Sequence, residues 1–269
     1  LFAYVITVFI IQVPWTIVLR QSFLPPVRSF HGDYITMIVA VLGTTISPYL
    51  FFWQASQEAE EVKDRRHEKP LLRSPEQATE QLWRIKLDTY LGMAASNLVA
   101  FFIMLTSAVM FHGHGNTNIQ TASEAAKALE PLAGRYAYIL FSAGIIGTGL
   151  LAVPVLAGAA AYAAGEAMRW RVGLEVKPWK AGKFYITVGA AMILGLSLNF
   201  IHLDPIKALF VAAVINGLLA APVMAMMMLM TQDRRIMGSF VLPGYLRIFG
   251  WAGTVVMCAA SLAFLFQAF

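Results

Sequence analysis

The sequence predicts an all-α polytopic membrane protein with about seven transmembrane helices. Of the 269 residues, 58% are hydrophobic and only 13% are charged, and the mean hydropathy is +0.65. An ordinary soluble domain carries about 25% charged residues. The polar residues also cluster between long apolar runs, as expected when each run crosses a hydrocarbon core about 30 Å thick. This composition excludes a water-soluble globular enzyme.

Seven apolar runs are long enough to span a bilayer. They are continuous and lack the alternation of a barrel strand, so we expect helices. The predicted spans are residues 1–19, 34–56, 89–111, 136–164, 184–201, 206–230 and 249–268, within one transmembrane domain, 1–269. The chain starts at Leu1, inside an apolar run, without a methionine or a basic segment. We therefore expect a fragment of a longer protein rather than a signal peptide.

Basic residues between the spans predict the orientation. Fifteen of the 20 Lys and Arg residues lie in the loops 57–88, 165–183 and 231–248, which alternate with loops that hold the other five. Basic loops are retained in the cytoplasm, so these three loops are predicted to be cytoplasmic. We expect an integral protein of a bacterial inner (plasma) membrane, with the lipid bilayer as partner. The net charge of +5 then reflects topology, and no nucleic acid is expected as a partner.

Two loops carry helix signals of their own. Ser74-Pro75-Glu76-Gln77 combines a capping serine, a proline at the first helical position and a glutamine three residues after the serine. It predicts a short helix that leads into the third span. Residues 121–132 place alanine and leucine at helical spacing, which predicts a helix on the outer membrane surface.

The second span contains the run Gly43-Thr44-Thr45-Ile46-Ser47-Pro48-Tyr49 near the bilayer midplane. Pro48 lacks an N–H donor and its ring clashes with the Thr44 carbonyl, so carbonyls near Thr44 and Thr45 are expected to lose their helical partners. One interpretation is a broken helix that coordinates an ion, as in many secondary transporters. The other is a proline kink whose carbonyls bond Ser and Thr side chains.

Three segments, in order along the chain, resemble the Nramp family of divalent metal ion transporters. The 43–49 run, which follows Phe23-Leu24-Pro25-Pro26, resembles that family's sixth helix. Glu130-Pro131-Leu132-Ala133-Gly134 resembles the stretch before its eighth helix, and residues 216–238 resemble its tenth helix with the basic segment that follows. The resemblance implies a LeuT-type inverted-repeat transporter fold. The chain would hold the fifth to eleventh helices, and the missing N-terminal helices of the same protein would be its partners.

The resemblance also implies a metal site. In that family, the sixth helix supplies a backbone carbonyl and a methionine sulfur to the metal, and two histidines follow. Here the carbonyl falls on Thr44, the sulfur position on Ser47, and the histidines on Tyr49 and Gln54. A hydroxyl in place of sulfur favours Mg²⁺ or Mn²⁺ over softer metals, which indicates the Nramp-related magnesium/manganese branch. The loss of both imidazoles removes titratable groups that proton coupling would use.

Further polar residues are expected to line the pathway: Thr45, Tyr49, Gln54, Asn97 and Asn216. Asn97 and Asn216 are amides inside spans, which more often bond neighbouring helices. No acidic residue lies deep in a span; Asp88, Glu166 and Asp204 are at span ends. A divalent cation in a membrane needs a carboxylate, and the resemblance assigns it to the missing first helix.

Other candidate features have simpler explanations. His112 and His114 are expected to be solvated in an outer loop. The methionines between Met224 and Met230 cover every face of a helix and are expected to serve packing. A small-residue face in the fourth span predicts close helix packing; it comprises Ser142, Gly144, Gly147, Thr148, Gly149 and Gly158. The one cysteine, Cys258, excludes a disulfide framework.

The sequence thus predicts a secondary transporter of divalent cations that works by alternating access. Mg²⁺ or Mn²⁺ is the expected substrate, with Fe²⁺ as a further candidate. No cofactor is expected besides the transported ion, and no enzymatic activity. The alternatives are a LeuT-type carrier of amino acids or another organic solute, a membrane enzyme, which lacks any matching cluster, and a non-transporting scaffold subunit.

Overall fold

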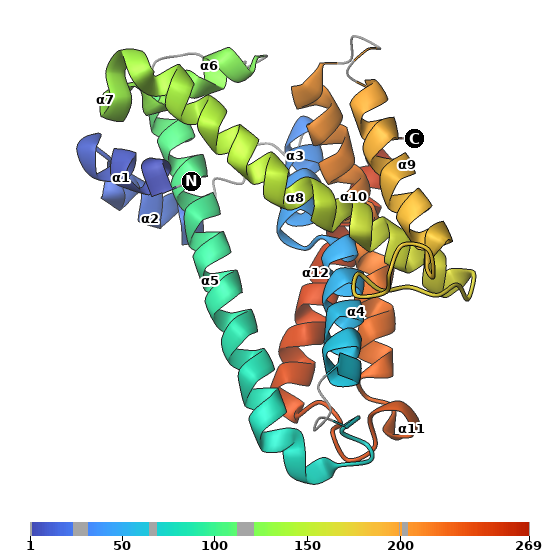
Figure 1. The fold of residues 1–269 in the computed structure, drawn as a ribbon. Helices are drawn as coiled ribbons and strands as arrows, with labels where there is room; N and C mark the ends of the chain where they lie inside the picture. The colour runs from blue at the N-terminus through green and yellow to red at the C-terminus, as the bar shows by residue number, and fades with distance from the viewer. Residues whose placement is uncertain are drawn as a thin grey trace. The chain divides into compact units, whose positions relative to one another are not determined.

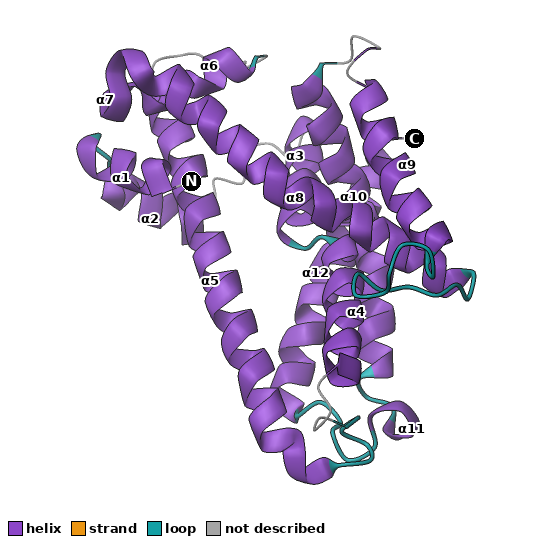
Figure 2. Ribbon diagram, viewed as in Figure 1, coloured by secondary structure: helices purple, strands orange, loops and turns teal. Residues whose placement is uncertain are grey.

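The structure is a computed structural model that describes residues 2–23, 32–64, 69–111, 121–198, 200 and 204–268. Every regular element in these ranges is helical, and none of them contains a strand (Figures 1 and 2). This confirms the all-helical fold class. Contacts divide the chain into two units, Leu1–Arg28 with Glu80–Ala152, and Ser29–Thr79 with Val153–Phe269.

The first unit starts with two short helices where one span was predicted. The expected continuous helix over 1–19 is wrong, because residues 11–14 separate α1 (Phe2–Ile10) from α2 (Trp15–Phe23). Pro14 has no N–H to donate, and its ring disfavours helical geometry at the preceding residue. The Pro14 carbonyl instead accepts hydrogen bonds from the N–H groups of Ile17 and Val18, both at 3.0 Å, which starts α2.

The helix expected before the third span is confirmed, because it continues into that span as α5 (Ala78–Phe111) after a 3₁₀ turn at Pro75–Gln77. The capping box expected there does not form. Ser74 occupies the N-cap position, but its side chain makes no capping hydrogen bond. The Gln77 side chain instead accepts a hydrogen bond from the Lys69 N–H at 3.1 Å.

The helix expected over 121–132 is present but divided into short pieces. Thr121 and Glu124 form a reciprocal capping box, with both hydrogen bonds at 3.2 Å, and α6 (Ala122–Ala126) begins there. A 3₁₀ turn, α7 (Glu130–Ala133) and a second 3₁₀ turn follow, and they lead into α8 (Ala137–Ala167). The location of these pieces at the membrane surface stays a prediction.

The second unit is built around α10. The unit contains α3 (Gly32–Thr45), α4 (Pro48–Asp64), the second half of α8, α9 (Gly182–Leu198), α10 (Pro205–Met230), α11 (Arg234–Met237) and α12 (Gly244–Ala268). Helix α10 packs against α3 and α12, which also contact each other (Figure 1). The core of this three-helix bundle is formed by Ile35, Val39, Ala40, Ala213 and Val214.

Within the described ranges, five helical segments are long and apolar enough to cross a membrane. They are Tyr34–Lys63, Pro75–Phe111, Ala122–Ala167, Pro205–Met230 and Gly244–Gln267. The first of these joins α3 and α4 across a break. The sixth apolar segment, Gly182–Leu198, corresponds to the predicted span 184–201 and is shorter, with 17 residues.

Packing in the described helices confirms the expectation for two of the methionines and for one glycine of the small-residue face. The side chains of Met224 and Met228 on α10 lie against Gly253 and Gly250 on α12, as expected for packing. On α8, Gly158 lies against the ring of Trp53. The rest of the small-residue face differs: around Gly144, Gly147 and Gly149, no described atom lies within 4 Å of the position of a Cβ. Close packing around these three glycines stays a prediction.

Candidate metal site at the broken helix

The break between α3 and α4 occupies Ile46 and Ser47. The Ile46 N–H still donates to the Leu42 carbonyl at 2.8 Å, and the next helix starts with a bond from the Leu50 N–H to the Ser47 carbonyl at 3.0 Å. Pro48 separates the two patterns because it has no N–H for the Thr44 carbonyl. The interruption predicted in the 43–49 run is thereby confirmed.

Hydroxyl groups bond part of the freed backbone. The Ser47 hydroxyl is buried and donates to the carbonyls of Gly43 and Thr44, at 3.0 and 3.2 Å. The Thr44 and Thr45 hydroxyls both donate to the Val41 carbonyl, at 2.8 and 2.9 Å, and both residues are exposed. The kink interpretation is therefore correct for these contacts. The Thr44 carbonyl still keeps a second lone pair.

Two further carbonyls at the break lack helical partners. Within the described segment 32–64, Ile46 and Ser47 lie in no hydrogen-bonded turn, so the Thr45 and Ile46 carbonyls accept no intrahelical bond. Such carbonyls, at membrane depth, need protein, water or a cation as partner. The break thus combines backbone oxygens with three hydroxyls, which are hard ligands of the kind that Mg²⁺ and Mn²⁺ prefer.

The break lies one turn beyond a close crossing of two backbones. A Cβ on Gly43 of α3 would overlap the Ala213 carbonyl and the Gly217 amide of α10, and a Cβ on Gly217 would lie 2.5 Å from the Val39 carbonyl. From α12, the buried Ser261 hydroxyl donates to the Gly217 carbonyl at 3.4 Å. Only glycine permits this approach, so the crossing fixes the end of α3 against the middle of α10.

The structure brings one of the predicted amides to this crossing. Asn216 precedes Gly217 on the turn of α10 that contacts α3, and it is half-buried. Tyr49 is half-buried and Gln54 is exposed on α4, after the break. Asn97 lies on α5 in the first unit, where it is exposed. The pathway roles of all these residues stay predictions.

No acidic cluster accompanies the break. Among the described residues, no group of three or more His, Cys, Asp and Glu side chains could hold a metal ion. His112 and His114 lie outside the described residues.

A second group of polar residues, toward the other end of α4, was not predicted from the sequence. The Tyr162 hydroxyl on α8 donates to Glu60 Oε1 at 2.9 Å and accepts from the Leu174 N–H at 3.1 Å and Gln57 Nε2 at 3.3 Å. One turn earlier on α4, the Ser56 hydroxyl donates to Glu166 Oε1 at 3.0 Å. We call these residues the polar clamp: Ser56, Gln57, Glu60, Tyr162, Glu166 and the Leu174 backbone.

A sequence signal for the polar clamp exists. Ser56, Gln57 and Glu60 share one face of a helix by their spacing, next to the Trp53 ring that contacts Tyr162 edge-on with ring centroids 5.8 Å apart. Tyr162 is fully buried, and a buried tyrosine hydroxyl needs a partner. Glu166, which was expected at the end of a span with a topological or gate-related role, is one of the bonded residues.

Known proteins are similar to this chain over nearly its whole length. A family model described as "Natural resistance-associated macrophage protein-like" (Nramp) matches residues 1–267. The "Divalent metal cation transporter MntH" of Caldanaerobacter subterraneus subsp. tengcongensis is 27% identical over 249 residues, which cover 92% of this chain and 54% of that protein. The protein of the same description from Clostridium acetobutylicum is 24% identical over 269 residues, covering 99% of this chain and 57% of that protein. The chain thus spans about half the length of the curated relatives it matches.

Proposed function

Because the chain belongs to the Nramp family, we propose that the full-length protein moves divalent metal cations across a membrane by alternating access. The family has a LeuT-type transporter fold, and the all-helical elements described here agree with it. Two relatives named above are divalent metal cation transporters by their descriptions. No covalent chemistry is part of this proposal.

The observation that carries the proposal is the break at Ile46 and Ser47. It leaves backbone oxygens of Thr44, Thr45 and Ile46 without helical N–H donors inside an apolar segment of 30 residues. The end of a half-helix presents its carbonyl dipoles to a cation, so this is a favourable place for an ion in a membrane. We assign the Thr44 carbonyl to the metal, with Ser47 as a direct or water-mediated ligand.

The same proposal assigns the pathway. Thr45, Tyr49 and Gln54 would line it on the α3–α4 side, and Asn216 would line it from α10. The carboxylate would come from helices that precede this chain in the full-length protein. The substrate is Mg²⁺ or Mn²⁺ rather than a softer metal, because Ser47 offers a hydroxyl oxygen at the position where the family has a methionine sulfur.

The test uses the full-length protein in proteoliposomes, with uptake of Mg²⁺, Mn²⁺ and Cd²⁺ measured for the unmodified protein, Ser47→Met and Ser47→Cys. Cysteine is nearly isosteric with serine, so it introduces a soft ligand without the bulk of methionine. We expect saturable Mg²⁺ uptake in the unmodified protein, and Cd²⁺ uptake in the variants that rises relative to Mg²⁺ by about tenfold, as expected when sulfur replaces a hard ligand.

The matched control is Ser197→Cys on α9, because the Ser197 hydroxyl also bonds a backbone carbonyl, that of Ile193, at 2.7 Å. This variant should keep the unmodified ion preference. Equal preference in the Ser47 and Ser197 variants would remove Ser47 from the site. Absence of any divalent flux from intact protein would overturn the metal proposal and favour a carrier of amino acids or another organic solute.

A further inference from the structure

The loop that joins α8 to α9 differs in its charge from the longest predicted cytoplasmic loop, 57–88. Residues 165–183 contain five basic and two acidic residues, whereas residues 57–88 contain seven basic and eight acidic residues. The five basic residues are Arg169, Arg171, Lys177, Lys180 and Lys183, and all are exposed. This segment therefore carries a concentrated positive charge that the longer loop does not.

The backbone of this loop is held in place from both sides. The Leu174 N–H donates to the Tyr162 hydroxyl at 3.1 Å, and the Leu174 carbonyl accepts from the Tyr185 hydroxyl at 2.9 Å. Val172 and Val176 pack against the buried cluster of Ala161, Tyr162, Ala181 and Phe184. The apolar residues of the loop thus face the protein, and the basic residues are directed outward on a preformed backbone.

An arginine occupies a position where glycine is usual. Helix α8 ends in a Schellman motif, in which the Trp170 N–H donates to the Gly165 carbonyl at 2.7 Å and the Arg169 N–H to the Glu166 carbonyl at 3.1 Å. Arg169 has φ +56°, the left-handed conformation that favours glycine at this site. The strained arginine adds one more cation to the loop, at the end of α8.

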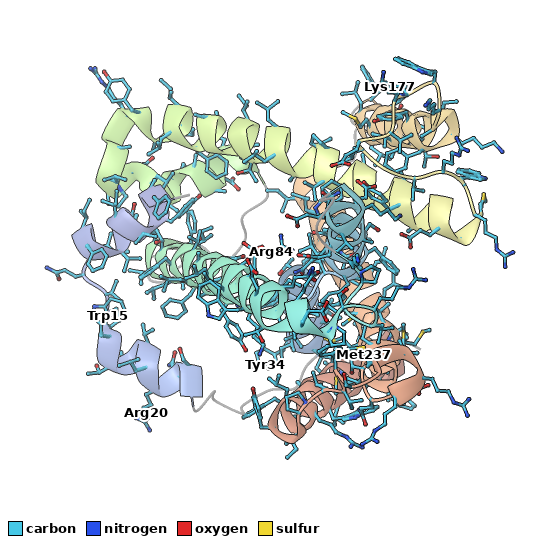
Figure 3. The ribbon with its side chains drawn as sticks, turned by 60° about the horizontal axis from the view of Figure 1, so that its bottom comes forward. Trp15, Arg20, Tyr34, Arg84, Lys177 and Met237 are labelled. Atoms are coloured by element: carbon cyan, nitrogen blue, oxygen red, sulfur yellow. The ribbon has the colours of Figure 1, made fainter. Side chains whose placement is uncertain are left out.

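Two tryptophans lie among these cations. Lys177 Nζ lies 5.5 Å from the ring centroid of Trp179, and Lys183 Nζ lies 5.3 Å from that of Trp170. The Trp179 side chain is 76% exposed, although its ring is large and apolar. Figure 3 shows Lys177 on this loop with neighbouring side chains projecting outward. Exposed tryptophan beside lysine and arginine is typical of residues that lie at the headgroup level of a membrane.

From this arrangement we propose that residues 168–183 form a binding surface for the phosphate headgroups of anionic phospholipids. The loop directly follows a helix of membrane length, so it lies at the level of the headgroups. Its predicted side is the cytoplasmic one, where anionic lipids attract basic segments. The Trp179 ring enters the interface, while Lys177 and Lys180 contact phosphate. This binding is independent of the solute that the protein carries.

The test measures lipid binding to the purified full-length protein. Tryptophan fluorescence is recorded in nanodiscs with brominated phosphatidylglycerol or brominated phosphatidylcholine as a minor component, for the unmodified protein and for Trp179→Phe. We expect stronger quenching by the anionic lipid, and we expect most of this excess to disappear in Trp179→Phe. Equal quenching by the two lipids would overturn the proposal.

A second measurement titrates the charge. Retention of phosphatidylglycerol by native mass spectrometry is compared between Lys177→Gln/Lys180→Gln and the matched control Arg234→Gln/Arg235→Gln on α11, all four residues being exposed. Two surface charges near a membrane should change apparent affinity by about tenfold or more. We expect that loss only in the loop variant. Equal loss in both variants would show a general charge effect and overturn the proposal, as would displacement of the lipid by inorganic phosphate at equal concentration.

Discussion

Different interactions stabilise the two ends of α4. At its first residue, Pro48, α4 meets a break whose neighbour, α3, is fixed to α10 by direct contact of two backbones at Gly43 and Gly217. At its other end, the polar clamp joins α4 to α8 through side-chain hydrogen bonds around the buried Tyr162. The first attachment requires glycines, which have no side chain, at the crossing of α3 and α10. The second requires particular hydroxyl and carboxylate groups on α4 and α8.

This difference indicates which motions the second unit permits. Two backbones in direct contact can pack in only one way, because neither backbone can move aside as a side chain can. A hydrogen-bond network can break and form again with alternative partners. We therefore expect α3 to move together with α10, and α4 to be able to shift against α8, with the two residues of the break as the joint. Four substitutions separate the two kinds of attachment.

The largest effect is expected for Gly43→Ala. The new methyl group would overlap backbone atoms of Ala213 and Gly217, which cannot rotate away as a side chain could. Overpacking costs about 1–3 kcal/mol and occasionally more, and here we expect the upper end of that range. Thermal unfolding of the purified protein in detergent measures it.

The control for this substitution is Gly189→Ala on α9. No described atom lies within 4 Å of the position of its Cβ, so alanine should fit there. Alanine is the better helix former by about 1 kcal/mol, and a small rise in the unfolding temperature is expected. If Gly43→Ala unfolds at the same temperature as Gly189→Ala, the backbone crossing does not hold α3.

Tyr162→Phe should have the next largest effect. It keeps the ring contacts with Trp53 and Phe184 but leaves the Leu174 N–H and Glu60 without the hydroxyl that bonds them. Loss of a partner costs about 1–3 kcal/mol for a fully buried polar group, and the two bonds lost here are partly buried, so we expect the lower part of that range. Tyr185→Phe is the matched control. The Tyr185 hydroxyl donates a hydrogen bond to the Leu174 carbonyl at 2.9 Å, and this bond is exposed to solvent. A Tyr185 variant that loses as much stability as the Tyr162 variant would contradict a central role for Tyr162.

Ser47→Ala tests the break itself. It removes the hydroxyl that bonds the Gly43 and Thr44 carbonyls, and we expect a cost of about 1 kcal/mol, that of an ordinary hydrogen bond. Thermal unfolding is again the measurement, with Ser197→Ala as reference for a serine bonded inside a helix. If Ser47→Ala loses more stability than Tyr162→Phe, the bonds at the break stabilise the protein more than the polar clamp does, contrary to our expectation.

The smallest effect is expected for Glu60→Gln. Its amide oxygen can still accept a hydrogen bond from the Tyr162 hydroxyl, so only the charge is lost, and we expect a smaller loss of stability than for Ser47→Ala. Ser56→Ala on the same face removes the bond to Glu166 and provides the comparison. If Glu60→Gln destabilises the protein more than Ser56→Ala, the carboxylate charge itself is required.

Local signals in the sequence predicted the break but not the polar clamp. Pro48 acts on the residues beside it, and Thr121 and Glu124 are only three positions apart, so both structures follow from short stretches of chain. Glu60 and Tyr162 are 102 positions apart, and only folding brings them together. The break at Pro14 carries the same local signal as Pro48; it was missed because average hydropathy identified the whole run 1–19 as one span.

The order of the helices along the chain has a consequence for biogenesis. The irregular backbone at Ile46 and Ser47 is tolerated in a membrane only where protein or water covers it. The turn of α10 that packs beside the break, around Ala213 and Gly217, is synthesised more than 160 residues later. At ribosomal speeds this is roughly ten to thirty seconds. During that interval we expect α3 and α4 to remain beside the insertion machinery rather than be released singly into lipid.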